Sequence, residues 1–209
     1  MDFGPTCCSI WPSDDYAADQ ALCIEFVNTV SWRGKPEPTD YLSDPEAWLT
    51  WMRDECAVPE DAWAELSKRA IEDPGEAEAA LSKAKEFREV LFHLLTHDKK
   101  IEKADELAFQ AMLTDAMARL RLRRQDDGWR FEPALSSCWE APLQAAALSA
   151  AQLLASPYAK KVKACGREEC RWLFLDLTKN HSRKWCDMSS CGNVVKARAC
   201  YARKKAAKD

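Results

Sequence analysis

The 209-residue sequence predicts a mostly helical, α+β protein that consists of a large N-terminal body and a small C-terminal module. Three observations lead to this fold class. Apolar residues recur at helical spacing in several long segments, the period changes to two over residues 118–133, and two cysteine pairs lie between Cys165 and Cys191. Hydrophobic residues make up 47% and charged residues 31%, which excludes a wholly disordered chain.

Residues 1–20 are expected to form a loosely attached arm, and residues 21–157 the body. The arm has no basic region and no long apolar region, so it does not resemble a secretory signal. The first element of the body covers Leu22 to Val30. Its β-branched and aromatic residues allow a strand and do not exclude a short helix. Pro36 and Pro38 then mark a loop.

Helical spacing predicts a series of helices in the rest of the body. They begin at Pro45 after a capping Asp44, after Pro59 and at Pro74; the next runs from about Ile101 to Ala118. The positions expected to share apolar faces are Trp48, Leu49 and Met52; Trp63, Leu66 and Ala70; Ala77, Leu81, Ala84, Phe87, Leu91, Leu94 and Leu95; and Ala104, Leu107, Ala108 and Ala111.

Residues 118–133 predict a β-hairpin with one face in water. Leu120-Arg121-Leu122-Arg123 and Trp129-Arg130-Phe131 alternate, and Asp126-Asp127-Gly128 between them is a turn signal. An alanine-rich helix follows over residues 139–155, with Ser137 and Glu140 as a possible capping box, and Ser156-Pro157 ends it.

Residues 158–209 form the predicted C-terminal module, because the charge balance changes there. The module carries fourteen lysines and arginines and five acidic residues, whereas residues 1–157 carry 16 basic and 29 acidic residues. A basic module favours binding to phosphates, and an acidic body repels them. No apolar run reaches 18 residues, so the sequence predicts no membrane span, and a cytoplasmic location with reduced thiols is expected.

The spacing Cys165-x4-Cys170-x15-Cys186-x4-Cys191 predicts one structural Zn²⁺ with four thiolate ligands. Such a site has no open position for water, which argues against metal catalysis. The alternatives are four unrelated buried thiols, or Cys200 or His181 as a replacement ligand. Residues 172–175 and Trp185 are expected to form two short strands beside the metal. Residues 194–207 are expected to form a helix, which gives a treble-clef-like order.

Two stretches of the chain resemble known families. The C-terminal motif Cys165…Cys170-x3-Phe174-x-Asp176…Arg183-x2-Cys186-x-Met188-x2-Cys191-Gly192-Asn193 resembles the CGNR zinc finger of bacteria. The upstream residues 22–32, with Asp40-Tyr41-Leu42 and Asp44-Pro45, resemble the ABATE domain that precedes this finger in a family of stress-induced transcription regulators. The resemblance implies DNA binding by the finger and a sensing or interaction role for the body. One departure is Val194, which stands where the family has an arginine.

The last helix and the residues before Cys186 carry the candidate DNA contacts. These candidates are Arg183, Lys184, Lys196, Arg198, Arg203, Lys204 and Lys205. Lys196, Arg203 and Lys204 share one helix face. The alternative is a solvated helix that maintains solubility, or a zinc-stabilised protein-interaction adaptor without specific DNA binding. A single finger is a weak sequence reader, so specific binding would need a homodimer with spaced half-sites.

Four polar residues in or just after the first element of the body are candidates for a ligand pocket: Glu25, Asn28, Thr29 and Arg33. The alternative is that they cap helices and satisfy backbone groups. His93 and His97 lack the glutamate of a zinc protease, and Cys7-Cys8 has no assigned role. The chain contains no nucleophile elbow, phosphate loop or dinucleotide fingerprint, so it is not expected to be an enzyme.

Overall fold

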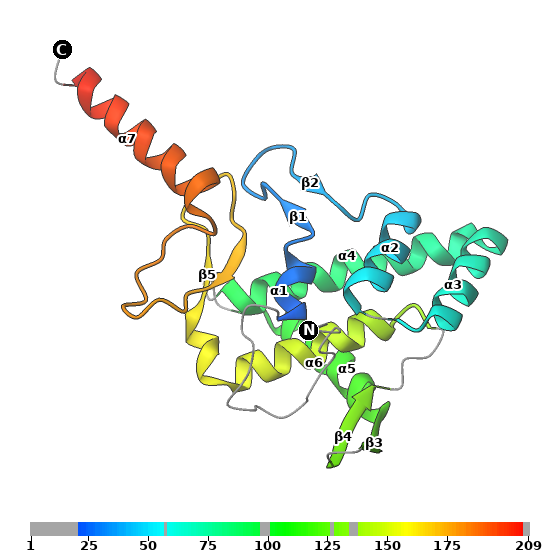
Figure 1. The fold of residues 1–209 in the computed structure, drawn as a ribbon. Coiled ribbons are helices and arrows are strands. Elements are labelled where there is room, and N and C mark those ends of the chain that lie inside the picture. The colour runs from blue at the N-terminus through cyan, green and yellow to red at the C-terminus, as the bar shows by residue number, and fades with distance from the viewer. Residues whose placement is uncertain (1–20, 57, 97–100, 126–127, 134–137, 207–209) are drawn as a thin grey trace.

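The computed structural model describes residues 21–56, 58–96, 101–125, 128–133 and 138–206 (Figure 1). The helices are α1 (Leu22–Val27), α2 (Pro45–Cys56), α3 (Glu60–Glu72), α4 (Pro74–Thr96), α5 (Lys103–Ala118), α6 (Ala141–Ala155) and α7 (Asn193–Ala206). The antiparallel strand pairs are β1 (Val30–Ser31) with β2 (Thr39–Asp40), β3 (Leu120–Gln125) with β4 (Gly128–Pro133), and β5 (Val162–Ala164) with β6 (Leu173–Leu175). The mostly helical fold class is therefore confirmed. Within the described residues, no helix combines the length and the apolar character needed to cross a membrane.

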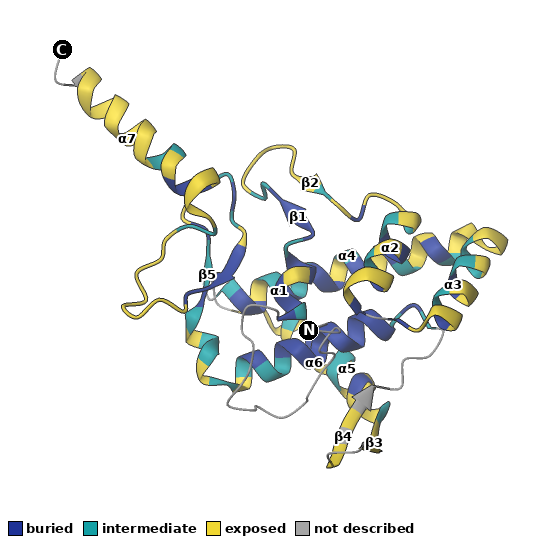
Figure 2. Ribbon diagram, viewed as in Figure 1, coloured by how far each residue is buried: buried dark blue, intermediate teal, exposed yellow. Residues whose placement is uncertain are grey.

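Helix α6 forms the centre of the body and is buried along most of its length (Figure 2). It packs against α1, α4 and α5, and its many alanines let these helices approach closely. The same core continues into the C-terminal module, since Val162, Leu173 and Leu175 belong to it. The module is therefore packed against the body.

Most predicted helix starts are confirmed. The open choice at Leu22 resolves to helix α1, followed by the short strand β1. The Asp44 carboxylate accepts a hydrogen bond from the Ala47 amide at 2.9 Å, as expected of a cap. Every predicted core position of α4 is buried. The residue before α6 is Glu140, which makes no side-chain capping bond, and Ser137 lies outside the described residues.

Helix α5 presents a different face to the core from the one that its alanines predicted. Ala104, Leu107, Ala108 and Ala111 are all exposed, and the helix buries Phe109 and Ala116 instead. Apolar residues occur on most sides of this helix, so spacing alone does not select a face. Burying the large Phe109 ring removes more apolar area from water than burying alanines does. The prediction of the buried face of α5 is therefore wrong.

The predicted hairpin at residues 118–133 is confirmed as β3 and β4, but both of its faces contact solvent. Leu122 pairs with Phe131 across the strands, and the two side chains are 54% and 41% exposed. Trp129 is 65% exposed. Asp126 and Asp127 lie outside the described residues. The hairpin thus projects from the end of α5 (Figure 1). Its apolar side chains are exposed to solvent.

Candidate metal centre

The sulfur atoms of the four predicted ligands lie together. Those of Cys165, Cys170, Cys186 and Cys191 are all within 4.8 Å of one another. The Sγ atom of Cys186 lies 3.7 Å from those of both Cys170 and Cys191. A regular tetrahedron of thiolates at about 2.3 Å from zinc has edges of about 3.8 Å. The cluster therefore fits a zinc ion that is closed on four sulfurs.

The first ligand pair lies in the turn between β5 and β6. Cys165 follows β5, and its amide donates to the Trp172 carbonyl at 2.7 Å, which extends the strand pairing. The second pair consists of Cys186 in a loop and Cys191 in the short helix η3 (Met188–Gly192), which leads into α7. The turn that carries Cys165 and Cys170, here called the metal knuckle, lies inside the β5–β6 hairpin, and α7 follows the second ligand pair. The final helix is as predicted, whereas the hairpin does not follow the knuckle as the sequence predicted.

The prediction of a strand around Trp185 is wrong, because β6 pairs with β5 instead. The segment around Trp185 has other partners. The Lys184 carbonyl accepts from the Gly166 amide at 2.8 Å, and the Trp185 carbonyl accepts from Arg183 Nε at 2.9 Å. The Trp185 ring packs against the cysteine cluster. These contacts hold Cys186 in place without a strand.

Asp187 and Gly192 shape the turn that carries Cys191. The Asp187 carboxylate accepts from the Ser190 amide at 2.7 Å and from the Ser189 hydroxyl at 2.6 Å. These hydrogen bonds lower the pKa of Asp187. A Cβ atom on Gly192 would overlap Met188 Sδ and press on the Trp185 ring, so a side chain here would force the Met188 side chain aside.

Hydrogen bonds between sulfur atoms connect the Cys186 thiol to those of Cys170 and Cys191. The hydrogen bond from Cys186 lowers the pKa of Cys170 to about 5, and the same bond raises the pKa of Cys186. A divalent cation at the centre would favour the thiolate form of all four residues, since metal ligands must be deprotonated.

Asp176 is a structural residue to which sequence reasoning assigned no role. It is fully buried. Its Oδ2 accepts from Lys163 Nζ at 2.5 Å and the Arg183 amide at 3.0 Å, and its Oδ1 accepts from the amide and hydroxyl of Thr178 at 3.1 and 2.6 Å. Burial raises the pKa of Asp176, but these donors outweigh burial and hold it well below its usual value. The carboxylate fixes the loop that leads to the second ligand pair. Its signal in the sequence is an acidic residue directly after the apolar run Leu173-Phe174-Leu175.

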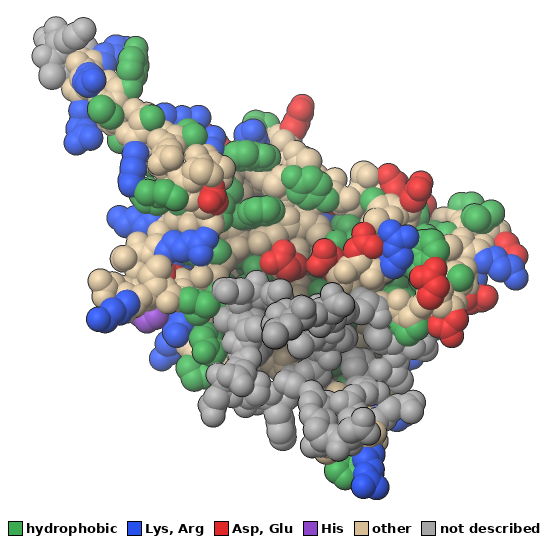
Figure 3. Space-filling model, in the orientation of Figure 1, with side chains coloured by type: hydrophobic (Ala, Val, Ile, Leu, Met, Phe, Trp, Pro, Cys, Tyr) green, Lys and Arg blue, Asp and Glu red, His purple; other side chains and the backbone are tan. Residues whose placement is uncertain are grey.

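The predicted DNA contacts on α7 lie on a helix that projects away from the rest of the molecule (Figures 1 and 2). All five of its cationic residues, Lys196, Arg198, Arg203, Lys204 and Lys205, are exposed. Arg198 is engaged, because its guanidinium binds Glu169 at 2.5 Å. Lys196 Nζ lies 5.5 Å from the centre of the Trp185 ring. Basic side chains surround α7, whereas acidic side chains gather over α2 and α3 (Figure 3).

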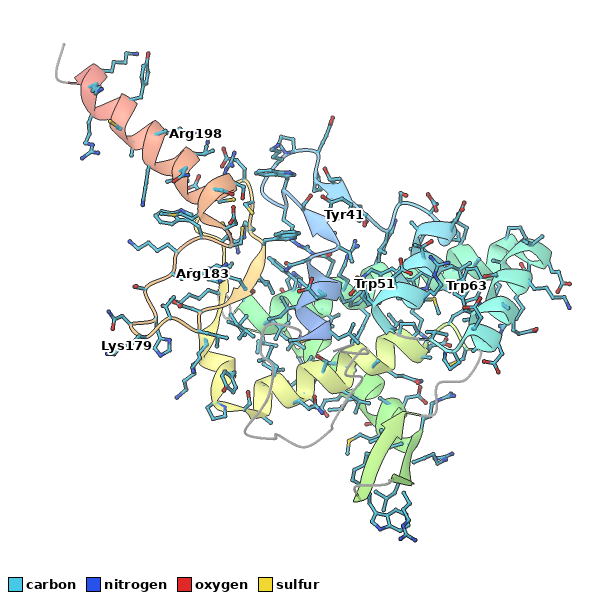
Figure 4. The ribbon with its side chains drawn as sticks, in the orientation of Figure 1. Tyr41, Trp51, Trp63, Lys179, Arg183 and Arg198 are labelled. Atoms are coloured by element: carbon cyan, nitrogen blue, oxygen red, sulfur yellow. The ribbon has the colours of Figure 1, made fainter. Side chains whose placement is uncertain are left out.

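Arg183 and Lys184 lie before the second ligand pair and differ in their contacts. The Arg183 guanidinium donates to the carbonyls of Trp185 and Cys186 and lies 4.6 Å from the centre of the Phe174 ring. Figure 4 shows it beside the finger, apart from Arg198 on α7. The Lys184 side chain is exposed. Arg183 therefore stabilises the metal loop directly.

Asn28, predicted as a pocket residue, connects the body to the finger. Its amide Nδ2 donates to the Leu173 carbonyl at 3.0 Å, and its Oδ1 accepts from the Leu173 amide at 2.9 Å. The Asn28 carbonyl also accepts from Trp172 Nε1 at 2.9 Å. The side chain thus bonds β6 as a neighbouring strand would.

We predict that Asn28→Ala speeds hydrogen exchange at the Leu173 amide by roughly 5- to 100-fold, since the variant cannot form two part-buried hydrogen bonds that each contribute about 0.5–1.5 kcal/mol. Hydrogen exchange followed by mass spectrometry measures this effect. Asn180→Ala, which changes an exposed loop residue, is the matched control. Equal exchange in the two variants would contradict the role given to Asn28.

The other predicted pocket residues point in different directions. Thr29 Oγ1 donates to the Phe26 carbonyl at 2.7 Å and accepts from Arg88 at 3.0 Å. Arg33 binds Glu89 at 2.6 Å and the Val27 carbonyl at 2.9 Å. Glu25 is exposed at its outer end, and burial and the charge of Glu55 raise its pKa. These contacts direct Thr29 and Arg33 toward α4.

An ion pair inside the body also escaped sequence reasoning. The buried Arg88 guanidinium makes two bonds of 2.8 Å to the Asp40 carboxylate. Burial of Asp40 raises its pKa, but the bonds from Arg88 outweigh burial and lower it. The pair connects β2 to α4. Its partners are 48 residues apart, so no local pattern in the sequence connects them.

A cavity of about 450 Å³ opens between β2 and α2. Its lining includes the rings of Tyr41 and Trp51, and Glu55, the neighbour of Glu25, lies on its wall. Figure 4 shows Tyr41 and Trp51 in this part of the body. The volume lies within the range of small-molecule sites, about 300–1,000 Å³.

The loop after β1 brings the body against the metal knuckle. The Gly34 amide donates to the Glu169 carbonyl at 3.2 Å, and a Cβ atom on Gly34 would overlap the Glu168 carbonyl oxygen. Trp32 packs beside the cysteine cluster, and its ring centre lies 4.7 Å from the Arg167 guanidinium. The metal site is therefore built from both parts of the chain.

Comparison with known families agrees with this geometry. Residues 20–157 match the ABATE family, which is described as "Putative stress-induced transcription regulator", and residues 161–204 match the CGNR zinc finger. No curated protein matches the chain. The first match covers more than half of the sequence and contains the helical body, and the second contains the four clustered cysteines. The chain therefore belongs to the ABATE family and carries a CGNR zinc finger at its C-terminal end.

Proposed function

We propose that this protein is a cytoplasmic transcription regulator whose zinc finger binds duplex DNA through α7. The observation that carries the proposal is the form of this helix. Its 14 residues include five cations and no carboxylate, and all residues from Lys196 to Lys205 are exposed. A helix of this length is marginal in water without a partner. The major groove of DNA admits an α-helix, and phosphates would neutralise its charge.

Four of the cations on α7 are available for such binding. Within the residues that the structure describes, no carboxylate forms an ion pair with Lys196, Arg203, Lys204 or Lys205. Lys184 lies exposed before the second ligand pair and would bind a further phosphate. Arg198 and Arg183 already have partners in the finger, so they would reach DNA only by exchanging those partners.

We predict that Lys196→Glu, Arg203→Glu and Lys204→Glu together lower affinity for duplex DNA at least 100-fold near 100 mM salt. For every phosphate that the variant no longer binds, the negative slope of log K against log salt should also become shallower by about 0.9. Fluorescence anisotropy of a labelled duplex at several salt concentrations measures both effects. Zinc content is determined in parallel to show that the finger remains loaded.

The matched control is the triple variant Arg53→Glu, Lys68→Glu, Lys103→Glu, which changes the net charge by the same amount on the body. These residues form surface ion pairs that contribute little to stability. Equal loss of affinity in both triple variants would mean that overall charge, and not α7, holds the DNA.

A second candidate function is a zinc-stabilised protein-interaction adaptor. The exposed apolar side chains of the β3–β4 hairpin favour it, because such patches mark interaction surfaces. Selection from randomised duplex DNA separates the two functions. An enriched motif supports a sequence-specific regulator, whereas no enrichment supports the adaptor.

We further propose that the body passes a signal to the finger. Asn28, Trp32 and Gly34 contact the finger directly, so a change in this segment would move the metal knuckle. The cavity beside Tyr41 and Trp51, with Glu25 near its wall, is the proposed binding site for a ligand. From this region, Asn28 makes contact with the finger, and Thr29 and Arg33 make contact with α4. A small molecule or a protein partner would act there.

A further inference from the structure

Two adjoining surfaces of the body expose apolar side chains. On α5 they include Leu107, which the sequence pattern places on the packed face, and Met117; these side chains are 58% and 59% exposed. On the hairpin they are Leu122, Trp129 and Phe131, which share one face by their register. The hairpin starts directly after α5, so both surfaces lie at the same end of the molecule (Figure 1). A two-stranded hairpin is marginal without packing, so this face requires a cover.

A groove lies beside these surfaces, between α4 and α5. It has a volume of about 420 Å³. Its floor is apolar and consists of Phe87, Val90, Ala108, Ala111 and Met112. Ala108 and Ala111 belong to the α5 face that the sequence predicted to be packed. The groove therefore has the apolar lining that a hairpin side chain such as Trp129 would fill.

The groove and the hairpin are also complementary in charge. The rim of the groove carries three carboxylates, those of Glu86, Asp115 and Glu140, of which Glu140 pairs with Lys83 at 3.1 Å and Asp115 with Arg119 at 3.5 Å. The hairpin exposes Arg124, which is paired with Trp129 on the apolar face, and Arg121, which lies on the opposite face. An acidic rim repels nucleic acid, so the charge favours a protein partner with a basic, aromatic tip.

We propose that two copies of this chain pair by inserting the hairpin of each into the α4–α5 groove of the other. The exchange is reciprocal, so it closes as a two-fold dimer and leaves no hairpin uncovered. A standard interface uses about 20–30 residues on each side. A surface of this size is available on the two six-residue strands of the hairpin together with the outer side of the 16-residue helix α5.

The first test measures the mass of the zinc-loaded full-length protein by sedimentation equilibrium without DNA. We expect about twice the 23.7 kDa of one chain. Trp129→Ser, which removes the anchor, and Ala111→Arg, which fills the groove and repels the arginines, should each raise the dimer dissociation constant at least about 30-fold. Ile71→Ser and Ala64→Arg make the same kinds of change at exposed sites on α3 and should leave the dimer intact.

Mixing the two disruptive variants tests the reciprocal pairing itself. Each variant alone has no intact hairpin–groove pair, whereas a mixed dimer has one, formed by the normal hairpin of Ala111→Arg and the normal groove of Trp129→Ser. The mixture should therefore associate more tightly than either variant alone.

Three results would overturn the proposal: a wild-type monomer at all concentrations, a dimer that survives either variant, or a mixture no tighter than its components. If another segment of the same chain covers the groove, the wild type should be a monomer at all concentrations. The α7 triple variant should remain dimeric, so failure of this inference and failure of the DNA proposal are distinguishable.

Discussion

Replacing Cys186 and Cys191 together by serine is expected to abolish zinc binding and to unfold the chain after Leu175, while the body stays folded. The packing around the sulfur atoms is small, since among the described residues only Trp32 and Trp185 accompany the cysteines there. Structural zinc contributes an apparent 10–16 kcal/mol, roughly, to the folding of isolated fingers. Strand β6 should persist, because Leu173 and Leu175 belong to the core of the body.

Elemental analysis and limited trypsin digestion measure this outcome. The wild type should hold one zinc ion per chain and resist cleavage at Arg183 and Lys184, and the double variant should hold none and be cut there rapidly. Cys200→Ser is the matched control, because Cys200 is exposed on α7 and lies outside the cluster. Retention of stoichiometric zinc by the double variant would refute the assigned ligand set.

Asp176→Asn should destabilise the finger by on the order of 2–4 kcal/mol, although the two side chains have nearly the same shape. The carboxylate accepts bonds on both oxygens, from Lys163 and the Arg183 amide on one and from Thr178 on the other. An amide has one acceptor oxygen, so its NH₂ group would face donors. Thermal unfolding of the zinc-loaded protein measures the loss, and Asp54→Asn at an exposed ion pair is the control.

The pH dependence of this difference has a defined sign. Because the folded protein lowers the pKa of Asp176, the carboxylate contributes stability above its unfolded pKa, about 3.9, and loses it as the pH falls toward the folded value. The difference in unfolding free energy between wild type and Asp176→Asn should therefore be constant above about pH 5 and become smaller below it. A gap that widens on acidification would contradict this account.

The parts of the fold that depend on local pattern were predictable from the sequence. The apolar positions of α4 recur at helical spacing and are all buried, and the two cysteine gaps place four sulfur atoms together. In both cases the residues that act together lie within one element or within two tight turns. Short-range geometry therefore decides the result.

Other features depend on interactions between distant residues. Asn28 and Leu173 are 145 positions apart, and neither residue type indicates the other. The strand pairing of β6 was mispredicted because the sequence around Trp185 resembles a strand while its carbonyls are satisfied by Arg183. The packed face of α5 was mispredicted because apolar residues surround the helix, and the positions of α4 and α6, which both pack against it, select Phe109 and Ala116.

The attachment of α7 to the metal turn has a mechanical consequence. The helix begins directly after Cys191 and Gly192, and its 14 residues extend for about 21 Å at 1.5 Å per residue. A small rotation at the turn that carries Cys191 therefore becomes a large displacement at the C-terminal end of α7. A tilt of about 10° at this turn moves that end by about 4 Å, which exceeds the length of a hydrogen bond. Gly34 touches Glu169 in the turn of the first ligand pair, and Glu169 also binds Arg198 of α7. If α7 binds DNA as proposed, a displacement in the body too small to alter its core would therefore change which phosphates Arg203 and Lys204 reach.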